Sequence, residues 1–150
     1  MKLLIPILIL VSGVVQAQEI SIRTRHFNLQ KQIAIGGYDP VSYFEGKPVE
    51  GNENLRVTHE GITYLFATVS NVSKFKAAPQ KYEPAYGGWC AYAMGASGEK
   101  VKVDPETYKI VNGKLYLFYN FWGNNTLEDW NENEQPLKAK ADQNWKKIVQ

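Results

Sequence analysis

Apolar and polar residues alternate most clearly in two segments of the chain. Over residues 55–66, apolar side chains recur at every second position on both sides of Glu60-Gly61, a dipeptide suited to a tight turn. Period-two alternation is typical of strands with one buried face, so this segment is predicted to be a β-hairpin. Residues 108–111 and 114–117 form a second predicted hairpin, because Asn112-Gly113 between them fits a type I′ turn.

Apolar residues at helical spacing predict a short helix in the middle of the chain and two helices near its end. Ser70 belongs to a residue type that caps helices, and Pro79 ends the segment after it, so a short helix is predicted between them. Thr126 is the expected cap of the next helix, and Pro136 precedes the last one. The last helix is predicted to dock through one apolar stripe, formed by Leu137, Ala141, Trp145 and Ile148.

Turn-forming residues divide the rest of the chain into short segments. Residues 41–44 and 47–49 flank Glu45-Gly46, which predicts another short hairpin. Asp39 precedes Pro40, and its carboxylate is expected to accept backbone N–H groups in an Asx-type turn; contact with a metal or substrate is the alternative. The elements predict an α+β fold, in which a small antiparallel sheet built from hairpins packs with a short helix and two C-terminal helices.

The first 17 residues have the layout of a cleaved signal peptide. Lys2 precedes an apolar run over residues 3–15, and Ala17 supplies the small side chain before the expected cleavage point. A membrane anchor is the disfavoured alternative, because the run is shorter than the ~20 residues that span a bilayer. We therefore expect a periplasmic or secreted protein with no transmembrane segment in the mature chain, made of an N-terminal arm (18–32) and one α+β domain (33–150).

Charge and cysteine content restrict the function classes. Cleavage after Ala17 removes one lysine, so the formal charge falls from +2 to +1, which gives no net electrostatic attraction to nucleic acid. Arg23 and Arg25 form a local basic patch, which we interpret as part of the exposed arm. Cys90 is the single cysteine, so no disulfide can form within the chain and its stability must come from packing.

Export also bears on modification. Asn71-Val72-Ser73 and Asn124-Asn125-Thr126 match the acceptor motif for N-glycosylation. Either asparagine would carry a glycan only in a host that has the required machinery.

Two sulfur-containing side chains are the first candidates for chemistry. Cys90 and Met94 are four positions apart, a spacing that places both sulfur atoms on one face of a helix, and soft sulfur ligands suit Cu(I). His59 is the third candidate metal ligand, although its place beside Leu55 and Val57 on one strand face favours a structural role. Burial of Cys90 and Met94 as core residues is the favoured alternative to a copper site.

Thiol chemistry at Cys90 is the second candidate. Cys90 would act as a nucleophile if His59 or His26 deprotonated it. The neighbouring Trp89 and Tyr92 indicate an apolar setting, which disfavours a thiolate. A non-enzymatic binding module is therefore favoured over an enzyme.

Aromatic residues of the second hairpin point to both faces of its strand. Tyr116 and Phe118 share one face, and Leu117 and Tyr119 share the other. A sheet that is covered on both sides accounts for this pattern. A ligand pocket lined by rings, or an exposed aromatic surface, is the alternative.

Several motifs in a fixed order resemble the exported members of the YHS-domain family. They are Gly-Tyr-Asp-Pro-Val-Ser-Tyr-Phe at 37–44, the hairpin at 60–66, Phe75 with Pro79 and Tyr82, Gly-Gly-Trp-Cys-Ala-Tyr-Ala at 87–93, and the run from 104 to 117. The resemblance covers roughly residues 33–149 and implies a YHS-like α+β domain. The exported members of this family are mostly of unknown function.

The resemblance also implies a relation to small cysteine-rich metal-binding modules found beside heavy-metal transporters. In those relatives, cysteines stand at the positions that Ser42, Ala67 and Asn71 occupy here, and none of these three is a thiolate donor. Residues and resemblance together predict an exported non-enzymatic binding module, with copper as the named candidate cofactor. A thiol-dependent enzyme or redox sensor that uses Cys90 is the alternative.

Overall fold

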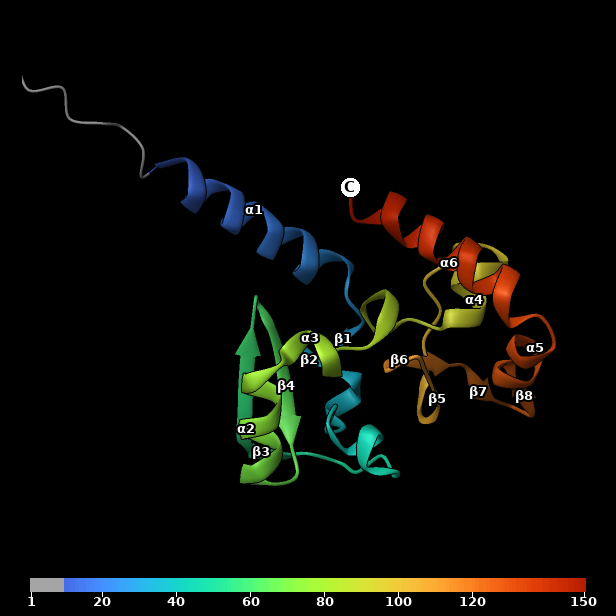
Figure 1. Ribbon diagram of the computed structural model, residues 1–150, viewed down its shortest axis with the longest axis horizontal. Coiled ribbons are helices and arrows are strands. Elements are labelled where there is room, and N and C mark those ends of the chain that lie inside the picture. The colour runs from blue at the N-terminus through green and yellow to red at the C-terminus, as the bar shows by residue number, and fades with distance from the viewer. Residues whose placement is uncertain (1–9) are drawn as a thin grey trace, which may run out of the picture.

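In a computed structural model, residues 10–150 are described and form an α+β fold of helices and small sheets (Figure 1). The helices are α1 (Leu10–His26), α2 (Val69–Ala77), α3 (Pro79–Tyr82), α4 (Ala91–Ala96), α5 (Thr126–Glu132) and α6 (Glu134–Ile148). The strands are β1 (Leu29–Gln30), β2 (Ile33–Ala34), β3 (Asn52–His59), β4 (Ile62–Phe66), β5 (Asp104–Val111), β6 (Lys114–Phe118), β7 (Asn120–Phe121) and β8 (Asn124–Asn125). Short 3-10 segments are η1 (Ile35–Gly37), η2 (Ser42–Glu45) and η3 (Ala85–Gly88).

The largest sheet has the strand order β1-β2-β4-β3. Strands β3 and β4 form the first predicted hairpin, in which His59 pairs with Ile62. The turn residues Glu60 and Gly61 both have left-handed φ values, 46° and 82°, as a tight hairpin turn requires. Strand β1 also pairs antiparallel with β2, whereas β2 and β4 pair in parallel. The predicted antiparallel hairpin is confirmed, and one short parallel pairing joins it to the N-terminal strands.

Helix α2 packs on this sheet through Phe75, which is buried. The Phe75 ring centroid lies 5.1 Å from that of Phe66 on β4. The short helix predicted before Pro79 is therefore present, but its cap is Thr68 and not Ser70. The Oγ1 atom of Thr68 accepts the backbone N–H of Asn71 at 3.1 Å.

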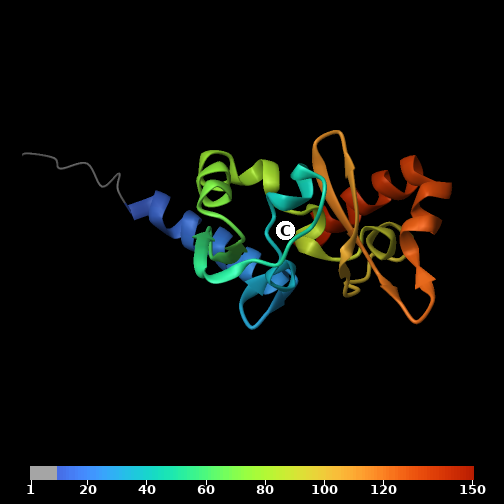
Figure 2. The ribbon, with the colours of Figure 1, turned by 90° about the horizontal axis from the view of Figure 1, so that it is seen from below.

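The β5–β6 hairpin separates two hydrophobic clusters. Its turn residues Asn112 and Gly113 have φ values of 50° and 74°, which confirms the type I′ prediction. Leu115 and Leu117 pack in the first cluster with the four-stranded sheet, and the alternate residues of β6, Tyr116 and Phe118, pack in the second cluster with α4, α5 and α6. In Figure 2 the hairpin, in orange, stands between the N-terminal half and the C-terminal helices. The strand is covered on both faces, as its aromatic pattern predicts.

Helices α5 and α6 are the two C-terminal helices that the apolar spacing predicts, but α6 begins at Glu134, so Pro136 lies in its first turn and does not precede it. In the α6 stripe, Leu137 and Ala141 are buried, while Trp145 and Ile148 pack against the second cluster and stay partly exposed. Helix α4 approaches α6 closely at Gly95. A Cβ atom added there would lie 2.5 Å from the backbone oxygen of Leu137, so the glycine is what permits this contact.

Two further local predictions are wrong. Residues 41–49 do not form a hairpin, because the backbone N–H of Val41 donates to the Asp39 side chain at 2.8 Å and starts the η2 turn. Gly46 then ends η2 with a φ of 99°. Helix α5 is capped by Asn125, whose side chain accepts the N–H of Leu127 at 3.1 Å, and not by Thr126.

The N-terminal segment also differs from the exposed arm expected over residues 18–32. Helix α1 continues to His26, and the side chain of Arg23 is only 21% exposed because it forms an ion pair with Glu83. Phe27 packs against the first cluster. Packing of the domain therefore begins before residue 33.

The predicted signal peptide, residues 1–17, lies partly outside the described residues, and its last eight residues belong to α1. Side chains of residues 13–19 are exposed. Within residues 10–150, no helix combines the length and the apolar character needed to cross a membrane.

Candidate functional site

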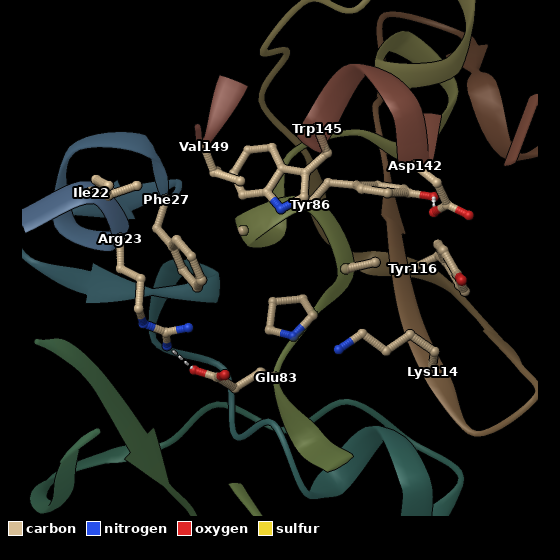
Figure 3. A pocket seen from close by; sticks show the side chains of 13 residues that line it. Ile22, Arg23, Phe27, Glu83, Tyr86, Lys114, Tyr116, Asp142, Trp145 and Val149 are labelled. Atoms are coloured by element: carbon tan, nitrogen blue, oxygen red, sulfur yellow. Dashed lines mark hydrogen bonds and ion pairs between the residues drawn. The ribbon is translucent and has the colours of Figure 1, made fainter. Parts of the chain in front are cut away.

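A pocket of about 490 Å³ lies where α1, η3, β6 and α6 meet. Pockets of roughly 300–1,000 Å³ are typical of small-molecule sites. Figure 3 shows the apolar side chains that wall it, among them Ile22, Phe27, Trp145 and Val149. It also shows four ionisable side chains at the pocket: Arg23, Glu83, Lys114 and Asp142. All of these residues follow the predicted cleavage point.

The backbone of the η3 segment packs directly against two aromatic rings at the pocket, those of Phe27 and Trp145. Tyr86 and Gly87 both have left-handed φ values, 54° and 60°. A Cβ atom on Gly87 would lie 2.9 Å from the Trp145 ring and 3.1 Å from the Cα atom of Phe27, so only glycine fits between them. The Phe27 and Trp145 rings meet edge to face at 6.2 Å. This glycine therefore lets two rings from opposite ends of the chain form one wall.

Glu83 is a buried carboxylate whose charge is compensated inside the protein. Its Oε1 atom accepts hydrogen bonds from Arg23 at 2.5 Å and from the Tyr64 hydroxyl at 2.7 Å. The Arg23 guanidinium also lies 4.6 Å from the centroid of the Phe27 ring. Burial, and then the charge of Glu83, raises the pKa of Tyr64 well above its usual value, so Tyr64 remains a neutral donor.

Asp142 is the second carboxylate at the pocket, and both of its oxygen atoms have partners. Oδ1 accepts from the Tyr86 hydroxyl and Oδ2 from the Lys138 ammonium, each at 2.8 Å. Burial, followed by the hydrogen bond to Asp142, raises the pKa of Tyr86. Tyr86 therefore acts here as a hydrogen-bond donor that joins η3 to α6 through Asp142.

Lys114 is the one ionisable group of the four that has no ion-pair or hydrogen-bond partner within residues 10–150. It stands at the first position of β6, directly after the Asn112-Gly113 turn. Its ammonium group points into the pocket from the side opposite Arg23 (Figure 3). Burial lowers the pKa of Lys114; the nearby charge of Glu83 raises it and that of Arg23 lowers it further.

Cys90 and Met94 are both fully buried, but they belong to different hydrophobic clusters. Cys90 stands at the N-cap position of α4. Its Sγ atom lies 3.4 Å from Oγ1 of Thr126 and accepts the backbone N–H of Tyr119 at 3.4 Å. Protein groups thus surround this sulfur.

His59 is partly buried on β3, where its ring meets the Phe75 ring edge on at 6.1 Å. Its Nε2 atom has no hydrogen-bond partner among the described residues, and the nearest carboxylate oxygen, on Glu60, is 3.9 Å away. Over residues 10–150, no three His, Cys, Asp or Glu side chains are grouped as a metal site requires. Copper binding by Cys90, Met94 and His59 stays a prediction, and so does thiol chemistry at Cys90.

Asp39 forms the Asx-type turn that its place before Pro40 predicts, and it does more. Oδ1 accepts the N–H of Val41, while Oδ2 accepts the N–H of Ala67 at 2.9 Å and the side-chain amide of Asn71 at 2.8 Å. The buried carboxylate therefore joins η2, the end of β4 and the start of α2.

The two glycosylation motifs differ in access. Asn71 is only 4% exposed and its side chain is bonded to Asp39, whereas Asn124 is exposed on the β7–β8 hairpin. In the folded protein, Asn124 is the accessible asparagine of the two.

Sequence reasoning missed the pocket. Glu83, Lys114 and Asp142 were not candidates, and Arg23 was assigned to an exposed arm. Their partners are remote in the chain, since the Arg23–Glu83 pair spans 60 positions and the Tyr86–Asp142 pair spans 56. The one usable signal is the alternation of β6, which places Lys114 on the same strand face as the aromatic Tyr116.

Comparisons with known proteins identified no relative of this chain. No protein-family model matches the chain, and neither the curated proteins nor the solved structures gave a match.

Proposed function

We propose that this chain is an exported, non-enzymatic binding protein with a YHS-like domain, and that it holds a small molecule in the pocket between α1, η3, β6 and α6. The observation that carries this proposal is the pocket itself, with its volume of about 490 Å³, its aromatic walls and its few ionisable groups. Apolar walls with a small number of placed polar groups are typical of small-molecule sites.

The residue types at the pocket support binding over catalysis. Among the described residues, its lining contains no cysteine, serine or histidine, and Cys90 is buried elsewhere. Both lining carboxylates, Glu83 and Asp142, already accept hydrogen bonds from two protein groups each. Groups engaged in this way serve to shape a site and are poorly placed to exchange protons with a substrate.

The exposure of α1 supports export. Residues 13–19 are exposed, and contact with the domain begins at Ile20 and Thr24, whose methyl groups would meet a Cβ on Gly61 at 2.7 Å and 2.9 Å. Contact thus starts just after Ala17, the predicted cleavage point. Removal of residues 1–17 would leave these contacts in place.

The surroundings of Asp39 support the YHS-like assignment. Ser42, Ala67 and Asn71, which stand where metal-binding relatives of that family have cysteines, all bond to Asp39 in this structure. Positions that form one metal site in a relative must lie close together, and these three do. In this chain the Asp39 carboxylate binds Ala67 and Asn71, and the Asp39 backbone oxygen binds Ser42.

A neutral, environment-sensitive dye tests the binding proposal. We expect N-phenyl-1-naphthylamine to bind the mature protein with a rise in dye fluorescence, because the pocket walls are aromatic. Val149→Trp places a large ring at the pocket and should weaken dye binding at least about fivefold, as overfilling a site displaces its ligand.

Val69→Trp is the matched control, because Val69 is 68% exposed on α2 and lies outside the pocket lining. It should leave dye binding unchanged. The proposal fails if the dye does not bind, or if both tryptophan variants bind it as the wild type does.

A further inference from the structure

Three of the four charged side chains that line the pocket are paired with other protein groups. Glu83 is paired with Arg23, which also forms an ion pair with Glu60 at 3.5 Å, and Asp142 is paired with Lys138 of α6. Lys114 has no ion-pair or hydrogen-bond partner among residues 10–150, and its ammonium points into the pocket (Figure 3). A molecule that enters therefore meets one ammonium group that forms no ion pair or hydrogen bond with the described protein groups.

The setting of Lys114 increases what its ammonium group gains from binding an anion. The side chain is partly buried beside Pro84 and Tyr116, and burial is the largest cause that lowers its pKa. A cation that has lost part of its hydration gains more from an incoming anion than an exposed lysine does. Screening by salt is also weaker at such a site than at the surface.

The apolar walls of the pocket determine which kind of ligand can cover them. Phe27 and Trp145 meet edge to face, and the aliphatic side chains of Ile22 and Val149 extend the same apolar surface. A small inorganic anion would leave this surface in water, whereas a planar apolar group would cover it.

This inference rests on the proposed function of the pocket as a small-molecule site. We propose that the ligand is an organic anion with an aromatic body, and that Lys114 binds its acidic group. Glu83 does not oppose this charge, because its own charge is held by Arg23 and Tyr64. The geometry thus places one cation at a pocket with an aromatic wall, a combination that fits an aromatic carboxylate or sulfonate.

Two dyes that differ in one sulfonate test the inference. N-phenyl-1-naphthylamine is neutral, and 8-anilinonaphthalene-1-sulfonate has the same ring system with an added negative charge. Titrated into the mature protein, the sulfonate dye should bind more tightly than the neutral dye. Lys114→Met should weaken the sulfonate dye about tenfold, as loss of a charged hydrogen bond does, and should leave the neutral dye within about twofold.

Controls separate charge from folding. Lys114→Arg keeps the charge and should retain the preference for the sulfonate dye. Lys140→Met removes an exposed lysine of α6 and should change neither affinity. Retained binding of the neutral dye shows that Lys114→Met is folded; if that variant does not fold, Lys114→Gln takes its place with the same expectation.

The outcomes distinguish the two proposals. If the neutral dye binds in the pocket but the sulfonate dye gains no affinity, or keeps it in Lys114→Met, the anion inference is overturned and the binding function stands. If Lys114→Met weakens both dyes equally, Lys114 has only a structural role and the inference is again overturned. If neither dye binds the wild type, both proposals fail.

Discussion

At the scale of single residues, Asp39 shows how one buried side chain can hold three segments of the chain together. It is fully buried and accepts three hydrogen bonds, one from its own turn and two from residues 28 and 32 positions further along the chain. A buried carboxylate is tolerated only when donors surround it, and here backbone N–H groups and an amide supply them. The local turn was predictable from Asp39-Pro40, whereas the two remote partners were not.

Asp39→Asn tests this role. An amide at this site would turn its own N–H groups toward the donors of Ala67 or Asn71, leaving donors buried without acceptors. We expect the free energy of unfolding to fall by about 2–4 kcal/mol, measured by urea denaturation. Asp129→Asn, on the exposed face of α5, should change it by less than about 0.5 kcal/mol. Equal stability of the two variants would show that the Asp39 hydrogen bonds contribute nothing net.

At the scale of elements, the accuracy of the sequence-based predictions follows the range of the interactions that decide them. Both hairpins were predictable because their turns, Glu60-Gly61 and Asn112-Gly113, carry the information within a few residues. Helix caps were wrong by one or two positions, since Thr68 competes with Ser70 and Asn125 with Thr126. The hairpin predicted over residues 41–49 was wrong because the buried carboxylate of Asp39, which lies outside this segment, determines its backbone conformation. Such competition is invisible to local patterns.

The contact of α4 with α6 is an element-level feature that no apolar pattern signals. A Cβ on Gly95 would lie 2.5 Å from the Leu137 oxygen, and all of the nearest atoms are backbone. The side chain of Asn144 adds a hydrogen bond to the backbone oxygen of Met94 at 2.9 Å. The two helices are therefore held at a fixed short distance.

Gly95→Ala should destabilise the protein, although alanine is the better helix former. Helix propensity alone would add about 1 kcal/mol of stability. The added methyl group forces α4 and α6 apart, which costs about 1–3 kcal/mol and more where backbone must move. We expect a net loss of about 1–2 kcal/mol in the free energy of unfolding, by thermal and urea unfolding.

Gln143→Ala is the reference for propensity, because Gln143 is exposed on α6. It should raise the stability by a few tenths of a kcal/mol. A Gly95→Ala variant as stable as this reference would mean that the two helices can separate without cost.

At the scale of the whole molecule, the segment after the predicted cleavage point is part of the domain. Arg23 bonds to Glu83, the backbone oxygen of His26 accepts the Trp89 indole N–H at 2.7 Å, and the N–H of Asn28 donates to Gly87 at 2.9 Å. These contacts all join the end of α1 to the segment around η3. The N-terminal segment thus completes the pocket by bringing one wall, Phe27, against Trp145 of the last helix. Charge and composition alone gave no sign of this, because they suggested only an exposed basic arm.

Two truncations separate the disposable part of α1 from the structural part. A chain that begins at Gln18 loses only residues that precede the first contacts, so its melting temperature should equal that of the longer chain. A chain that begins at Asn28 loses the Arg23–Glu83 ion pair and the buried part of Phe27, and leaves Glu83 with the Tyr64 hydroxyl as its remaining side-chain donor. Because an unpaired buried carboxylate and a lost apolar wall both oppose folding, we expect its free energy of unfolding to fall by about 2–4 kcal/mol. It should also no longer bind the neutral dye.

Arg23→Met in the chain that begins at Gln18 tests the ion pair alone, and the stability of this variant should lie between those of the two truncations. If the chain that begins at Asn28 melts with the longer one and binds the dye equally well, α1 is an appendage and the pocket is formed without it.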